Sequence, residues 1–107
     1  MSTERPQDAV RLGYWLADMS RADYSKVVVF HEGGDHLWAC ECVMDEKIAF
    51  GAYGHKSATN AITDCWLKFM DEHIHTMANG DASVYAGLCG EVEEARAALE
   101  QYEKVKL

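Results

Sequence analysis

Long apolar runs, positive charge and proline are scarce in this sequence of 107 residues. No run approaches the ~20 apolar residues that a membrane-spanning helix requires, so we expect no such span. Ten basic residues against 18 acidic ones leave a formal net charge of −8, which repels phosphates and disfavours direct binding of nucleic acid. Residues 1–7 are polar and contain no apolar core of a signal peptide, so we expect a cytoplasmic protein.

The common catalytic motifs are absent as well. The sequence contains no Gly-x-Ser-x-Gly, no phosphate-binding Gly-x-x-x-x-Gly-Lys and no His-Glu-x-x-His. A thiol enzyme would need Cys65 or Cys89 beside His55 or His73, but Cys65 falls in the middle of an apolar helical stripe, where its thiolate is disfavoured. We therefore expect no enzyme, no catalytic residue and no cofactor, and we keep a metal- or thiol-dependent enzyme as the third hypothesis.

Cysteine and histidine do not form a recognisable ligand framework. Without a signal peptide, the four cysteines are expected to stay reduced. His31 and His36 are expected to face each other across a turn, on the sheet face that carries Cys40. Zinc accepts such ligands, but the short Cys-x₂₋₄-Cys pairs of structural sites are missing. The prediction is no metal site, with the state of this histidine pair left open.

Apolar periodicity predicts a single α+β domain over residues 1–107. Three runs read as an antiparallel meander, with turns at residues 32–35 and 45–46. Helical spacing flanks the meander, and Ser57 and Asn79-Gly80 bound the clearest helix. The predicted elements, in the order α-β-β-β-α-α, are a helix over 6–20, strands over 26–31, 36–44 and 47–53, and a helix over 57–78. The last helix carries an apolar seam over 85–102 and is predicted most firmly from 91 to 104.

The turn at residues 45–46 implies a register. It places Met44 opposite Lys47 and, further along the strands, makes the opposed pairs Cys42 with Ala49, Cys40 with Gly51 and Trp38 with Tyr53. Both sheet faces then carry mostly apolar side chains, with Glu41 as the exception. An antiparallel sheet with one wet face alternates between apolar and polar residues. This register therefore predicts helices on both faces of the sheet.

Residues 51–62, with the predicted helix–three strands–helix order, resemble a double-stranded-RNA-binding domain. That family grips phosphates with a cluster of lysines at the start of the second helix. Here Lys56 alone stands in that position and its neighbours are neutral. The resemblance implies a similar topology without RNA binding.

A second resemblance covers roughly residues 26–78. The small-residue strand Ala49-Phe50-Gly51-Ala52 is followed by a helix with Ala61-Ile62-Thr63-Asp64-Cys65-Trp66, which looks like the small αβ sandwich domains of phages and prophages. This resemblance implies a virus-encoded accessory protein without catalytic residues. Many small acidic phage proteins disable bacterial defence, and anti-CRISPR proteins are the best-known class.

The acidic residues suggest how such a protein would act. A folded acidic surface can occupy the basic nucleic-acid channel of a defence nucleoprotein complex and associate through electrostatic steering. The alternative is a homodimeric accessory or structural protein that associates through a coiled-coil-like seam of Tyr85, Leu88, Val92, Leu99 and Tyr102. The residues predicted to contact the partner, a CRISPR effector complex by preference, are Glu32, Asp35, Asp45, Glu46, Asp71, Glu72, Glu91, Glu93 and Glu94.

Overall fold

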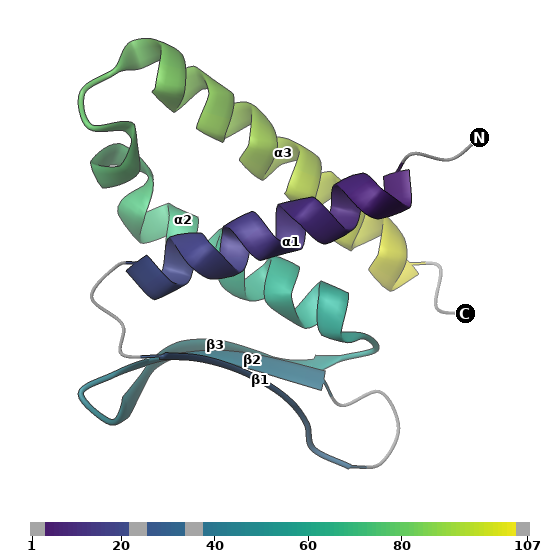
Figure 1. Cartoon of the computed structure of the whole chain (residues 1–107). Helices are drawn as coiled ribbons and strands as arrows, with labels where there is room; N and C mark the ends of the chain where they lie inside the picture. The colour runs from purple at the N-terminus through teal and green to yellow at the C-terminus, as the bar shows by residue number, and fades with distance from the viewer. Residues whose placement is uncertain (1–3, 22–25, 34–37, 105–107) are drawn as a thin grey trace.

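The chain folds into a three-stranded antiparallel sheet and three helices, which confirms the predicted α+β class and element order. A computed structural model describes the backbone of residues 4–21, 26–33 and 38–104, and the side chains of residues 12–20, 26–33 and 38–101. Asp35, His36 and the side chain of Tyr102 lie outside this part. The elements are α1 (Glu4–Arg21), β1 (Lys26–His31), β2 (Trp38–Met44), β3 (Lys47–His55), α2 (Ala58–Ala78) and α3 (Ala82–Lys104) (Figure 1).

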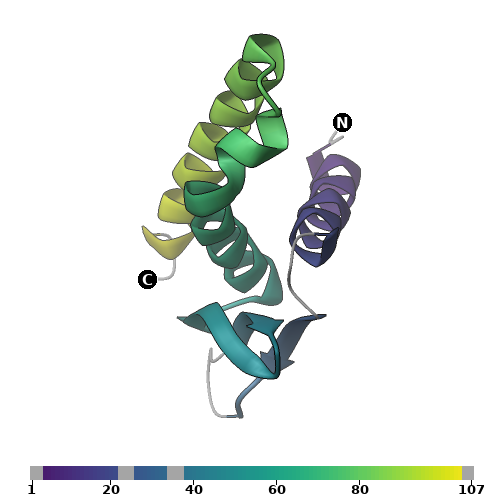
Figure 2. The ribbon, with the colours of Figure 1, turned by 90° about the vertical axis from the view of Figure 1, so that its left-hand side faces the viewer.

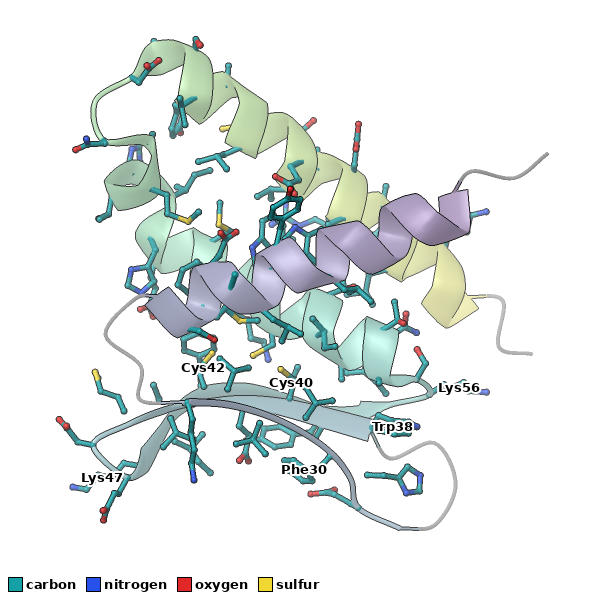
Figure 3. The ribbon with its side chains drawn as sticks, viewed as in Figure 1. Phe30, Trp38, Cys40, Cys42, Lys47 and Lys56 are labelled. Carbon is teal, nitrogen blue, oxygen red and sulfur yellow. The ribbon has the colours of Figure 1, made fainter. Side chains whose placement is uncertain are left out.

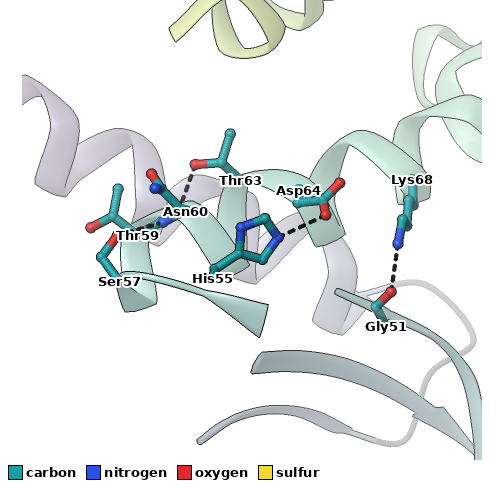
Figure 4. Close-up of polar contacts among 8 residues, drawn as sticks. All are labelled: Gly51, His55, Ser57, Thr59, Asn60, Thr63, Asp64 and Lys68. Carbon is teal, nitrogen blue, oxygen red and sulfur yellow. Dashed lines mark hydrogen bonds and ion pairs between the residues drawn. The ribbon is translucent and has the colours of Figure 1, made fainter. Parts of the chain in front are cut away.

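Helix α2 begins and ends where its sequence predicts. The Ser57 hydroxyl accepts a hydrogen bond from the backbone N–H of Asn60 at 3.1 Å, as an N-cap residue does (Figure 4). At the other end Asn79 has a φ of 53° and Gly80 a φ of 80°, so the chain leaves the helix through the left-handed conformation that these two residues tolerate best.

Helix α3 begins earlier than predicted, at Ala82 rather than at residue 85. The Asp81 carboxylate accepts hydrogen bonds from the backbone N–H groups of Ser83 and Val84, at 2.9 and 3.2 Å. This cap satisfies donors that would otherwise be open at the helix start. The cap holds the first turn of α3 even though Gly87 and Gly90 lower the helical propensity that follows.

The predicted register holds only at the turn. Met44 pairs with Lys47 and Val43 with Ile48, but two bulges in β3 then shift the pairing. Each bulge adds a residue on one strand and so moves every later side chain relative to its partner. Opposite β3, Cys42 pairs with Phe50, Cys40 with Ala52 and Trp38 with His55, and not with Ala49, Gly51 and Tyr53 as the sequence suggested.

All three helices lie on one side of the sheet, so the expectation of helices on both faces is wrong. Figure 1 shows the helices above the sheet, and the view turned by 90° in Figure 2 shows the same separation. Helix α2 lies against the sheet, α1 beside it over β1, and α3 packs against α2. The molecule is a two-layer structure in which only one sheet face is covered.

The core fills the space between the sheet and the helices. The rings of Trp15 on α1 and Trp66 on α2 stack with their centroids 4.3 Å apart. Below them, Cys40 and Cys42 point from β2 toward the helices, whereas Phe30 lies on the opposite side of the sheet (Figure 3). Small cysteine side chains on the strand allow α2 to approach the sheet closely.

We call the uncovered side of the sheet the open face. Strand alternation and the observed register place even-numbered β1 residues and odd-numbered β2 residues on it. From β3, Ile48 and Tyr53 lie on the open face, where they are 56% and 48% exposed. The open face consists of Val28, Phe30, Ala39, Glu41, Val43, Ile48, Gly51 and Tyr53, with Lys26 at its rim.

Candidate functional site

The buried sulfur atoms form the densest group of chemically reactive side chains. The Cys42 thiol donates to the Met19 sulfur at 3.5 Å, and the Sγ atoms of Cys42 and Cys65 are 3.9 Å apart. Hydrogen bonds to Cys40 and Cys42, together with burial, raise the pKa of Cys65 far above its ordinary value. All four side chains are fully buried, so these thiols pack the core and are unsuited to nucleophilic attack.

The histidines are held by contacts that do not assemble a nucleophile. His55 Nε2 lies 2.9 Å from Asp64 Oδ2 in a partly buried pair (Figure 4). The His73 ring stacks on Phe69, and the His75 ring stacks on Tyr85. The partners described for the two histidines considered for a thiol enzyme are therefore Asp64 for His55 and Phe69 for His73.

His31 has local partners. Its ring meets the Trp38 ring edge-on, and its Nδ1 accepts a hydrogen bond from the Gly33 backbone N–H at 3.2 Å. Its predicted neighbour His36 lies outside the described residues. Among the side chains that the structure describes, no group of three or more His, Cys, Asp or Glu is arranged to hold a metal ion.

Most of the predicted partner-binding residues lie on the surface. Asp45 and Glu46 form the β2–β3 turn, Asp71 and Glu72 follow one another on α2, and Glu93 lies on α3. Figures 1 and 2 show that α2 begins beside the sheet and leads away from it toward the start of α3. The exposed members of the predicted set are Glu32, Asp45, Glu46, Asp71, Glu72, Glu93 and Glu94.

Glu91 differs from the rest of the predicted set. Its Oε2 accepts a 2.7 Å hydrogen bond from the indole N–H of Trp15, and the side chain is half-buried. A buried indole N–H without a partner is costly, so this contact stabilises the packing of α1 near α3. Glu91 is therefore a structural residue in this fold, a role that its position in a run of acidic residues does not reveal.

The α3 seam is occupied within the chain. Ala95 is buried, and Leu88, Val92 and Leu99 pack against the core cluster, whereas Tyr85 stays exposed. The same residues were the predicted contact of a homodimer. Leu88, Val92 and Leu99 already pack inside the chain, so a dimer through them would compete with these contacts. The homodimer through this seam stays a prediction.

Sequence reasoning missed one cluster, which lies on the open face. The Tyr53 hydroxyl donates to Glu41 Oε2 at 2.7 Å, and the same ring lies over Gly51. A Cβ built on Gly51 would overlap the Tyr53 hydroxyl oxygen, so the ring keeps this position only over a glycine. The bulges bring Tyr53 to this face, and no residue pattern in β3 announces them.

Comparison with known proteins identifies no relative. No protein family, curated protein or solved structure matches this chain. Within the described residues, none of the helices has the length and apolarity to cross a bilayer. The class that the fold defines is a two-layer α+β domain with a sulfur-rich core, an exposed set of acidic side chains and one uncovered sheet face.

Proposed function

We propose that this protein is a non-enzymatic inhibitor that binds a bacterial defence nucleoprotein complex, as anti-CRISPR proteins do, through exposed carboxylates. The observation that supports the proposal best is that acidic side chains on the β2–β3 turn, α2 and α3 are exposed and separate from the core. Such carboxylates can stand in for phosphates in a basic channel. The resemblance of residues 26–78 to small phage domains suggests the source of the chain and the kind of target.

The division between carboxylates bonded within the fold and exposed carboxylates also supports this proposal. Several carboxylates are committed to the fold, since Asp18 accepts from Trp66, Asp64 pairs with His55, and Asp81 caps α3. Other acidic residues on the turn and the helices are exposed, and the chain keeps a net charge of −8. Attraction between such a surface and a basic channel is long-ranged and weakens as salt screens it.

The test is a pull-down of CRISPR effector complexes from bacterial lysate with the tagged protein, followed by mass spectrometry. We expect retention at about 0.05 M salt and release at about 0.5 M salt, where the Debye length falls to a few ångströms. The double variant Asp71→Asn/Glu72→Gln should lower retention at least about tenfold, because loss of opposite charge mainly slows association.

A matched control separates local contact from overall charge. Tyr14→Lys/Val84→Lys raises the net charge by the same two units at exposed positions outside the predicted surface. Equal loss of binding in both double variants would show that only total charge matters. If no effector complex is retained at low salt, the inhibitory function itself is wrong, and the net charge then serves solubility.

A further inference from the structure

The open face is mostly apolar, although two of its three β3 residues are well exposed. Ile48 is 56% exposed and Tyr53 48% exposed on β3, and Val28 and Phe30 on β1 are half-buried. Between them, Ala39 and Val43 of β2 are buried. A solvated sheet face normally carries polar residues at these positions. Contiguous exposed apolar residues with a polar rim are typical of an interaction surface.

The open face carries too little negative charge to be the surface that binds the basic channel of a defence complex. Glu41 is its central carboxylate and is already hydrogen-bonded by the Tyr53 hydroxyl, while Lys26 lies at the rim. The remaining exposed carboxylates of α2 and α3 are carried by the opposite layer. A basic channel would gain little electrostatic attraction from the open face. A second apolar sheet could pack against it, because the face is nearly neutral.

The size of the face suits a weak dimer. Three strands about 4.8 Å apart and six residues of about 3.3 Å each cover roughly 14 by 20 Å. A footprint of this size on each copy is small for a protein interface, because standard interfaces bury about 800 Å² per partner. Such an area fits a weak, reversible dimer and not an obligate one.

The rim charges select one arrangement of the two sheets. Lys26 begins β1, and Glu32 follows its last residue, so opposite charges mark the two ends of the strand. His31 pairs with Trp38 and Trp38 pairs with His55, so Glu32, which follows His31, lies at the end of the sheet where β3 finishes. Two sheets packed face to face can be related by a twofold axis that lies between them and runs perpendicular to the strands. This axis reverses the strand direction, so Lys26 of each copy lies at the end that carries Glu32 of the other.

We propose that the open face binds a second copy of this chain, so that two sheets pack face to face in a helix–sheet–sheet–helix sandwich with Lys26 of each copy near Glu32 of the other. Face-to-face packing of two twisted sheets about 10 Å apart is a common way to bury such a surface. The proposal does not rest on the inhibitory function. The dimer leaves the carboxylates of α2 and α3 on the outside, although it uses Glu32 of the predicted partner-binding set.

Sedimentation equilibrium of the purified protein from micromolar to millimolar concentration tests the proposal. We expect a reversible monomer–dimer equilibrium that Ile48→Lys weakens at least 30-fold, because each dimer contains the changed side chain twice. Ile48 is exposed, so its change leaves the monomer folded. The matched control Val84→Lys, 43% exposed on α3, should leave the equilibrium unchanged.

The charge pair tests the orientation. Lys26→Glu and Glu32→Lys should each weaken the dimer, and the two changes together should restore it. A monomer at millimolar concentration overturns the proposal. A dimer that tolerates Ile48→Lys but dissociates with Leu99→Glu also overturns it, because the interface would then be the α3 seam.

Discussion

The Tyr53 side chain contacts two neighbouring residues of the sheet, Gly51 and Glu41. Its ring covers Gly51, where a side chain has no room, and its hydroxyl donates to Glu41 on the neighbouring strand. The glycine weakens the strand through its conformational freedom, and the aromatic ring offsets this by packing over it. The same contact keeps a carboxylate hydrogen-bonded in the middle of an apolar face.

This contact predicts a late tyrosine titration. The hydrogen bond to Glu41, aided by partial burial and by the negative charge of Glu41, raises the pKa of Tyr53 from 10 to about 12. A group whose folded pKa is raised stabilises the fold fully below its unfolded value, so this contribution is present below pH 10 and is lost as the pH rises through about 12. Absorbance titration of phenolate should show a tyrosine near pH 12 that Tyr53→Phe removes.

Glu41→Gln provides the control for this titration. It keeps the shape of the acceptor but removes its charge, so the pKa of Tyr53 should fall back toward 10. An unchanged late titration in Glu41→Gln would contradict the assigned cause.

Among the elements, the β2–β3 hairpin departs furthest from its sequence preferences. Both residues of its turn have positive φ, 53° for Asp45 and 65° for Glu46, which is the arrangement of a type I′ turn. Asn-Gly is the preferred pair for this turn, and glutamate pays a steric cost at its second position. The two-residue loop nevertheless keeps Met44 opposite Lys47, as its length predicts.

Replacing the turn with its preferred pair should stabilise the protein. We expect Asp45→Asn/Glu46→Gly to raise the free energy of unfolding by about 1 kcal/mol, because glycine reaches positive φ without strain. Urea denaturation followed by tryptophan fluorescence measures the change. Glu46→Ala is the matched control, since it removes the charge but keeps the strain. A gain as large in Glu46→Ala would assign the effect to charge.

The whole molecule is held together by a core that joins all the layers through sulfur and indole groups. Met19 from α1, Cys42 from β2 and Cys65 from α2 meet in it, and the two stacked tryptophans close it on the helix side. No buried polar side-chain atom in the described part of the chain lacks a hydrogen-bond partner. Such a core exposes its thiols only when the layers separate.

Thiol reactivity therefore reports global opening. Cys89 on α3 is half-buried, whereas Cys40, Cys42 and Cys65 are buried. With Ellman's reagent at neutral pH we expect one thiol to react rapidly and three to react at least about a hundredfold more slowly, at a rate set by unfolding. Cys89→Ser should abolish the rapid phase alone. Rapid reaction of a second thiol would show that the sulfur core opens locally.

The sequence by itself determined the local structure. The capping residues Ser57, Asn79 and Gly80, together with apolar periodicity, located α2. The β-branched run of residues 27–29 located β1, and the length of the β2–β3 loop fixed the first residue pairs beyond the turn. These features could be predicted because they depend on neighbours along the chain.

Only the tertiary structure decided which face each residue of β3 occupies, where the helices lie and which carboxylates are exposed. The bulges that move Phe50 and Ala52 under the helices follow from packing against α2, and the Glu91–Trp15 bond joins residues 76 positions apart. Periodicity cannot locate such features, because a shift of one residue exchanges the two faces of a strand without changing its composition.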